Sequence, residues 1–266
     1  LARAYEEFAT RILEIVAPLV PVVKAQSAFF EAAGPPGLTA LQRVLHRARE
    51  HGLITILDSK RNDIASTATA YADAALAGVS VAGRLHPVWD ADALTVNPYL
   101  GRDAVEPFLQ SGRRSGRGVF ILVRTSNPGA GQFQDLCCDG RPLFLHVAVA
   151  VRTWTREHLG QAGFGDVGAV VGATQPAELA TVRKTLPEAY LLVPGFGAQG
   201  AVPADTAAAF RDDGLGAIIN SSRGIIASFH PEEPGWETKV AQATRSEIAA
   251  LAKATPMGRL APTVRN

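Results

Sequence analysis

The chain has 266 residues, of which 47% are hydrophobic and 19% are charged, and its formal net charge is +1. This length suffices for one sizeable core, so we expect a single domain over residues 1–266. The near-neutral charge excludes a bulk attraction to nucleic acid or to a membrane surface, so any anion site must be local. No apolar run approaches the roughly 20 residues that span a bilayer, and we expect neither a membrane span nor a signal peptide.

The cysteines and histidines give no metal or disulfide pattern. Cys137 and Cys138 are the only cysteines and are adjacent in sequence. This arrangement is typical of a protein from a reducing compartment, and we expect a cytoplasmic location. The histidines are scattered, mostly over predicted helices, and predict no metal cluster. They are His46, His51, His86, His146, His158 and His230.

The first part of the chain alternates helical and strand patterns. Apolar residues recur at helical spacing over 3–14. A β-rich run at 19–24 ends at a lysine, and Pro35-Pro36-Gly37 is expected to break the chain before a helix over 38–51. The short apolar run at 53–58 predicts a buried strand.

The rest of the chain repeats this alternation. Helices are predicted at 64–77, 102–112, 142–159, 176–185, 203–213 and 236–254. Strands are predicted at 94–96, 118–123, 167–171, 191–193 and 216–219. Residues 79–92 are less regular, and 130–141 read as a polar loop.

Seven predicted strands alternate with helices, which indicates an α/β fold with a parallel sheet. Polar residues follow nearly every strand at its carboxyl end, which is where a (β/α)8 TIM barrel carries its active site. A barrel needs eight strands, and the chain opens at Leu1 inside a predicted helix. We therefore expect strand 1 to be missing from the N-terminus of this chain. An open doubly wound sheet is the alternative architecture.

The most informative stretch runs from Leu53 to Ile64 and reads Leu-Ile-Thr-Ile-Leu-Asp-Ser-Lys-Arg-Asn-Asp-Ile. Side chains alternate across a strand, so Asp58 and Lys60 are predicted to lie on one face, and Asp63 falls past the strand end. Buried charges are costly unless they pair, so a functional site is one interpretation of this stretch. The alternative is an ion pair at a strand end with Asp63 as a helix N-cap.

The ends of the last two strands together predict a phosphate site. Pro194-Gly195-Phe196-Gly197-Ala198-Gln199-Gly200 offers backbone N–H groups, and Asn220-Ser221-Ser222-Arg223-Gly224 adds a guanidinium. TIM barrels often bind phosphate after strands 7 and 8. Ordinary glycine-containing turns are the alternative interpretation. The first segment does not have the spacing of a dinucleotide-binding Gly-x-Gly-x-x-Gly motif.

These residues carry a resemblance to a known family. Asp58-Ser59-Lys60-Arg61-Asn62-Asp63 resembles the Asp-x-Lys-x-x-Asp motif of orotidine 5′-phosphate decarboxylases. The longer bacterial branch of that family, type 2, is also similar in order along the chain at 22–31, 95–101, 125–129, 170–174 and 194–200. The resemblance implies a carboxy-lyase that converts orotidine 5′-phosphate to uridine 5′-phosphate and CO2, the last step of de novo UMP synthesis.

The resemblance also implies roles around the reacting carbon. Lys60 would donate a proton to C6 of the pyrimidine after CO2 leaves, and Asp58 would lie near the departing carboxylate. Asp63 would reach across a homodimer interface into the neighbour's site, with Ile64 and Thr67 beside it. The family needs no metal and no organic cofactor.

The remaining implied roles concern substrate binding. Lys24 would contact the ribose, and Ser126 would read the pyrimidine edge. The phosphate would be held by Gln199 and Arg223, with the backbone of Gly195 and Gly224. One departure from the family is plain: its first strand ends in an aspartate that contacts the ribose, and that residue is not found here.

Two other functions remain open at this point. A magnesium-dependent sugar-phosphate lyase of the hexulose-phosphate synthase or keto-gulonate-phosphate decarboxylase type shares the barrel together with Asp58, Lys60 and Asp63. A metal requirement would favour that alternative, whereas Ser126 and the Gln199 loop favour a pyrimidine substrate. The other alternative is an inert barrel that binds a nucleotide without turnover.

Overall fold

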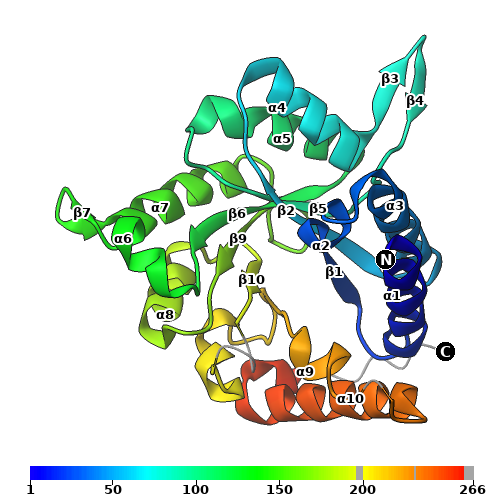
Figure 1. The fold of residues 1–266 in the computed structure, drawn as a ribbon. Helices are drawn as coiled ribbons and strands as arrows, with labels where there is room; N and C mark the ends of the chain where they lie inside the picture. The colour runs from blue at the N-terminus through cyan, green and yellow to red at the C-terminus, as the bar shows by residue number, and fades with distance from the viewer. Residues whose placement is uncertain (196–199, 231, 261–266) are drawn as a thin grey trace. The chain divides into compact units, whose positions relative to one another are not determined.

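The computed structural model describes residues 1–195, 200–230 and 232–260 (Figure 1). The chain divides into two compact units, Leu1–Leu122 and Val123–Asn266, and the boundary falls inside one strand. The expected single domain over 1–266 stays a prediction.

The first unit is built on parallel strands in the order β1 (Val22–Gln26), β2 (Ile54–Arg61), β5 (Ala93–Val96) and β6 (Gly118–Arg124). Every residue of β5 is buried, and so are residues 55–58 of β2. Continuous apolar runs of this kind are typical of parallel strands that are covered on both faces. The polar residues that follow these runs therefore stand out as candidates for function.

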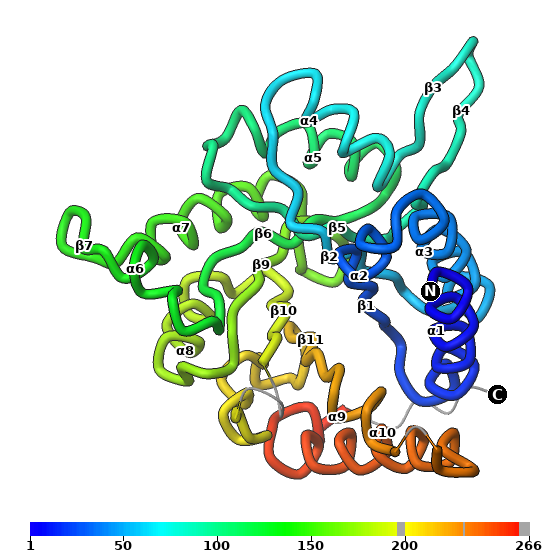
Figure 2. Tube along the Cα trace, viewed as in Figure 1, coloured from blue at the N-terminus to red at the C-terminus, as the bar shows by residue number. Residues whose placement is uncertain are grey.

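Helices follow or precede each of these strands. They are α1 (Ala2–Val16), α2 (Ser27–Glu31), α3 (Gly34–Glu50), α4 (Ala65–Ala72), the π-helical turn η1 (Asp73–Ala77) and α5 (Arg102–Ser115). Helix α1 packs along α3, and the chain path between them can be followed in Figure 2. Leu41 and Leu45 lie on the buried face of α3 and are each 1% exposed.

Three local predictions in this unit need correction. Pro35 and Pro36 lie in the first turn of α3 and do not break it. Proline is tolerated there because the N–H groups of the first turn have no acceptor within the helix. Residues 79–92, predicted to be less regular, contain a hairpin of β3 (Val79–Val81) and β4 (Arg84–His86) that extends away from α4 and α5 (Figure 1). The helix predicted over 64–77 is α-helical only to Ala72 and ends at Gly78, whose φ of 86° lies in the left-handed region.

The second unit holds the parallel strands β9 (Val167–Val171), β10 (Leu191–Val193) and β11 (Ala217–Ile219), with β10 in the middle. Its longer helices are α7 (Leu143–Arg156), α8 (Pro176–Thr185) and α10 (Trp236–Ala254). Short elements complete the unit: η2 (Pro128–Ala130), α6 (Gly131–Gln134), β7 (Cys137–Cys138), β8 (Arg141–Pro142), η3 (Pro203–Ala209), α9 (Arg223–Ile226) and η4 (Pro256–Arg259). The predicted bounds of β9, α8, β10 and α10 are confirmed, whereas the helix expected over 203–213 is a shorter 3-10 helix.

Apart from the four strands of the two small hairpins, the described residues contain seven strands. The pairings of these seven within each unit are all parallel. Their alternation with helices confirms the predicted α/β class. Among the described residues, no helix is both long and apolar enough to cross a membrane.

Candidate active site

Asp58, near the carboxyl end of β2, is the centre of a charged cluster in the first unit. Its Oδ2 accepts hydrogen bonds from Lys24 Nζ at 2.5 Å and from Gln26 Nε2 at 3.2 Å. Its Oδ1 accepts from Lys60 Nζ at 2.7 Å and from the Thr95 hydroxyl at 2.9 Å. An ionised carboxylate has about four acceptor positions, so this one is saturated. The prediction that the side chains of Asp58 and Lys60 lie on one face of the strand is confirmed by their direct contact.

The environment of Asp58 favours its charged form. Its side chain is only 8% exposed, and that burial alone would raise its pKa. The charges and hydrogen bonds of Lys24 and Lys60 outweigh the burial, so the pKa of Asp58 falls below its ordinary value. The carboxylate is therefore ionised at neutral pH and holds two ammonium groups in place.

Lys60 stands at an irregularity in the sheet. Leu57 pairs with Leu94, but the next pairing joins Arg61 to Val96, so residues 58–60 lie opposite Thr95 alone. Such a bulge redirects side chains, and Lys60 itself has a φ of 46°, in the left-handed region that non-glycine residues rarely adopt. Strain of this kind is retained where the surrounding contacts fix it.

Thr95 on β5 fixes the bulge. Its Oγ1 accepts from Ser59 N at 3.1 Å and from Lys60 N at 2.9 Å while its proton goes to Asp58. A hydroxyl has one donor and two acceptor positions, so all three are used. Thr95 therefore connects the unusual backbone at Lys60 to the carboxylate that its ammonium binds.

The two lysines of the cluster differ in exposure. The Lys24 side chain is 11% exposed, whereas that of Lys60 is 44% exposed. Lys60 Nζ thus binds Asp58 while much of the Lys60 side chain is exposed. An ammonium held in this way can stabilise negative charge that develops beside it and can donate a proton to it.

Asp63, Ile64 and Thr67 lie beyond this cluster. Asp63 follows β2, and its carboxylate accepts from Ile64 N at 2.8 Å. The N-cap position of α4 is occupied by Ile64, and no side chain caps the helix with a hydrogen bond. The alternative interpretation of Asp63 as the helix N-cap is therefore wrong. Asp63 forms no ion pair within the part of the chain that the structure describes, and Ile64 and Thr67 are exposed.

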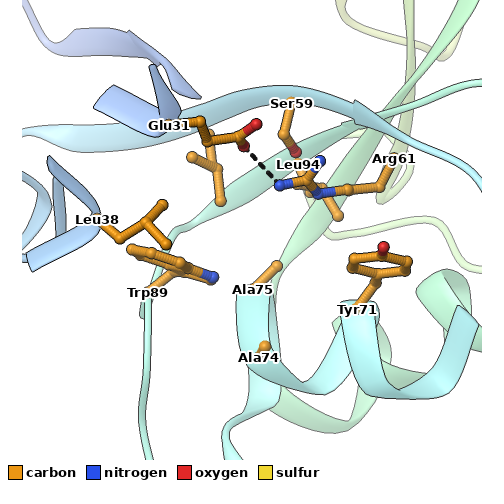
Figure 3. A pocket seen from close by; sticks show the side chains of 10 residues that line it. Glu31, Leu38, Ser59, Arg61, Tyr71, Ala74, Ala75, Trp89 and Leu94 are labelled. Atoms are coloured by element: carbon orange, nitrogen blue, oxygen red, sulfur yellow. Dashed lines mark hydrogen bonds and ion pairs between the residues drawn. The ribbon is translucent and has the colours of Figure 1, made fainter. Parts of the chain in front are cut away.

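A separate pocket of about 420 Å³ lies on the other face of β2 (Figure 3). Leu57, Ser59 and Arg61 line it, and these residues alternate along the strand with Asp58 and Lys60. The guanidinium of Arg61 binds the carboxylate of Glu31 at 2.7 Å beside the ring of Tyr71, as Figure 3 shows. The pocket therefore does not contain the charged cluster.

Ser126 lies in the second unit, just past the end of β6, and is half-buried. Gly172, just past β9, packs directly against it, because a Cβ on Gly172 would lie 2.7 Å from Ser126 Cβ and 2.9 Å from its Cα. Gly172 N also donates to the Arg124 carbonyl at 2.8 Å. A glycine at 172 is thus required for the position of the Ser126 backbone.

The predicted phosphate-binding residues also belong to the second unit. Gln199 lies outside the described residues, and Gly195 has a φ of 95°. Arg223 begins α9, is exposed and forms no ion pair with another described residue. Gly224 lies against Glu247 of α10, since an added Cβ would meet Glu247 Oε1 at 2.1 Å.

Several site residues were not predicted from the sequence. Thr95 and Gln26 complete the shell of Asp58, and neither has a pattern that distinguishes it from an ordinary strand residue. Glu247, which lies against Gly224, was not predicted either; burial raises its pKa although the Ser221 hydroxyl donates to it at 2.9 Å. Among the described residues, no group of three or more His, Cys, Asp or Glu side chains could hold a metal ion, and Cys137 and Cys138 are free and exposed.

Comparison with known proteins identifies the family of the chain. The model of the "Orotidine 5′-phosphate decarboxylase / HUMPS family" matches residues 4–235. The chain belongs to this family. Relatives named orotidine 5′-phosphate decarboxylase include that of Rhodopirellula baltica, which is 48% identical over 254 residues, covering 92% of this chain and 82% of the relative. That of Deinococcus radiodurans is 46% identical over 215 residues, covering 80% and 74%.

Solved structures of the family share the fold. The chain is similar to Leishmania donovani OMP decarboxylase with a TM-score of 0.75 and 33% identity, covering 94% of this chain and 89% of the other. It is similar to Leishmania donovani UMP synthase with a TM-score of 0.75 and 34% identity, covering 93% of this chain and 51% of the other. The (β/α)8 fold class is therefore confirmed, and the open doubly wound sheet is excluded.

The role of the Thr95 hydroxyl can be tested with a matched pair of substitutions. Thr95→Val leaves two bulge N–H groups without their acceptor, so we expect the free energy of unfolding to fall by about 1–3 kcal/mol. Thr95→Ser keeps the hydroxyl and loses one methyl group, which corresponds to about 0.8 kcal/mol. Urea unfolding measures the free energy of unfolding of both variants. Equal losses in the two variants would show that the hydroxyl does not hold the bulge.

Proposed function

We propose that this chain decarboxylates orotidine 5′-phosphate to uridine 5′-phosphate and CO2, the last step of de novo UMP synthesis, and needs no metal or organic cofactor. The observation that carries the proposal is the ammonium of Lys60 held 2.7 Å from the buried carboxylate of Asp58 in a chain of this family. A relative named orotidine 5′-phosphate decarboxylase matches 92% of this chain, which supports the same reaction here.

The chemistry of the reaction requires such a group. Loss of CO2 from C6 leaves a carbanion whose lone pair lies in the plane of the pyrimidine ring, where it cannot delocalise into the π system. A cation that is already in place lowers the energy of this carbanion, and it does so without reorganisation during the reaction. Lys60 supplies the cation and then donates a proton from Nζ to C6. The C6–carboxylate bond breaks, CO2 leaves, and a C6–H bond forms.

Asp58 has two parts in this proposal. Its carboxylate holds the Lys60 ammonium in place through a 2.7 Å hydrogen bond. Its carboxylate also lies near the departing carboxylate of the substrate, and repulsion between the two is relieved when CO2 leaves. The low pKa of Asp58 supports both parts, since each needs the ionised form.

The other proposed roles concern the substrate's remote groups. Lys24 contacts the ribose, and Ser126 reads the pyrimidine edge. Arg223 binds the phosphate. Its exposed guanidinium, which forms no ion pair with another described residue, supports this role. The rest of the proposed phosphate site is Gly195, Gln199 and Gly224. Binding energy from the phosphate can then contribute to the barrier at C6.

We also propose a cytoplasmic homodimer in which Asp63 reaches the neighbour's site. Asp63 has no ion-pair partner among the described residues of its own chain, and Ile64 beside it is 55% exposed. These properties are expected of residues that contact a second copy. Thr67, in the first turn of α4, is exposed on the same segment and belongs to the proposed interface.

The proton-donor role of Lys60 can be tested with two variants. Lys60→Ala removes the cation and the acid, and general acid catalysis alone contributes about 10²–10⁴ in rate, so we expect at least that loss in kcat. Lys60→Arg keeps a charge beside Asp58 but cannot donate its proton, because the guanidinium pKa is too high. We therefore expect the kcat of Lys60→Arg to be almost as low as that of Lys60→Ala. The measurement is the decay of orotidine 5′-phosphate absorbance, and near-normal turnover by either variant would contradict the role.

The phosphate role of Arg223 predicts a different kinetic pattern. Arg223→Ala removes a hydrogen-bonding cation, and bonds to charged groups contribute about 1.5–3 kcal/mol, so KM should rise roughly 10- to 150-fold. Arg245 on α10 is also exposed and unpaired among the described residues, so Arg245→Ala is the matched control. Steady-state kinetics on both variants makes the comparison. An unchanged KM in Arg223→Ala would place the phosphate elsewhere.

A further inference from the structure

We propose that Arg124 and Gln134 are positioning residues that fix the Ser126 loop for recognition of the pyrimidine ring. The inference rests on the proposed function, because it assumes that Ser126 reads the ring. Both residues lie in the second unit, at the end of β6 and at the end of α6.

Arg124 is a buried cation with every nitrogen engaged. Its side chain is 7% exposed, and its Nε donates to Glu178 Oε2 at 2.6 Å. Its Nη2 lies 3.1 Å from Asp135 Oδ1, and its Nη1 donates to Gln134 Oε1 at 3.2 Å. The guanidinium carbon also lies 5.7 Å from the ring centre of Phe144. Two carboxylates and an amide thus fix the plane of this guanidinium.

Gln134 transmits this fixed position to the Ser126 loop. The oxygen that accepts from Arg124 also accepts from Thr125 N at 2.9 Å, and Gln134 Nε2 donates to Thr125 Oγ1 at 2.8 Å. The reversed amide would place its NH2 against two N–H donors, so this orientation is the only one that satisfies the network. The residue before Ser126 is therefore held at both backbone and side chain.

The residue after Ser126 is held by the same chain of bonds. Having accepted from Gln134, the Thr125 hydroxyl donates its proton to Asn127 Oδ1 at 2.7 Å. Asn127 in turn accepts at its backbone carbonyl from Ala130 N at 3.0 Å. Ser126 thus stands between two neighbours that this network holds, and Gly172 packs against its backbone.

A buried strand end of this kind can be completed without a charged residue. Arg124 ends a buried apolar strand, where an aliphatic residue would pack without two carboxylate partners. A charged, fully bonded group at this position is explained if the orientation of the loop matters, since a bidentate guanidinium gives geometric specificity. The polar group available for the ring is then the side chain of Ser126.

The decisive variant is Gln134→Glu. A glutamate can still accept from Arg124 and from Thr125 N, but it cannot donate to the Thr125 hydroxyl. That hydroxyl must then turn its only proton to the glutamate and release Asn127. Gln132 is an exposed residue on the same short helix α6, so Gln132→Glu makes the same charge change without touching the network.

The readout compares two ligands that share ribose phosphate. Titration calorimetry measures binding of uridine 5′-phosphate and of ribose 5-phosphate, which lacks the ring. In Gln134→Glu we expect about tenfold weaker binding of uridine 5′-phosphate, the equivalent of one hydrogen bond, and ribose 5-phosphate affinity within about twofold. Gln132→Glu should match the wild type for both. Thr125→Val, which removes the hydroxyl but keeps the backbone contact, should reproduce the selective loss and serves if Gln134→Glu does not fold.

The outcomes separate the inference from the function beneath it. A wild-type chain that binds uridine 5′-phosphate no better than ribose 5-phosphate, or has no decarboxylase activity, overturns the proposed function. A wild type that decarboxylates and prefers the nucleotide, with a Gln134→Glu variant that weakens both ligands equally or neither, overturns the positioning role alone.

Discussion

The saturation of Asp58 is the constraint on which the proposed chemistry depends. A carboxylate buried to this extent is stable only if its acceptor positions are filled, and two ammonium groups, an amide and a hydroxyl fill them. Two of these partners also fix Lys60, whose ammonium binds the carboxylate and whose backbone N–H, at a φ of 46°, donates to Thr95. The buried charge of Asp58 is therefore balanced by partners from three neighbouring strands.

A similar principle organises the loop that follows β6. Arg124 is buried and fully bonded, and Gln134 carries its fixed position to the residues on either side of Ser126. In both units a strand end carries a buried charge that several elements hold: Asp58 has partners on β1, β2 and β5, and Arg124 has partners on α6 and α8.

Sequence reasoning succeeded where the signal is local. Buried parallel strands read as apolar runs, so 167–171 and 191–193 were predicted with their bounds, and Pro176 marked the start of α8. The Asp58–Lys60 contact followed from alternation along one strand. Thr95 could not be predicted, because its role depends on a register shift between β2 and β5 that no single segment encodes. Gln134 was missed for the same reason: its partner Arg124 lies on a different element.

The most direct test of the account is the ultraviolet absorbance of orotidine 5′-phosphate mixed with this chain in excess EDTA. If the Asp58–Lys60 cluster performs the decarboxylation without a metal, the spectrum decays to that of uridine 5′-phosphate at the same rate with and without the chelator. No decay in either condition, or decay only when Mg²⁺ is restored, would contradict the account, and the second result would favour a metal-dependent lyase of the same fold.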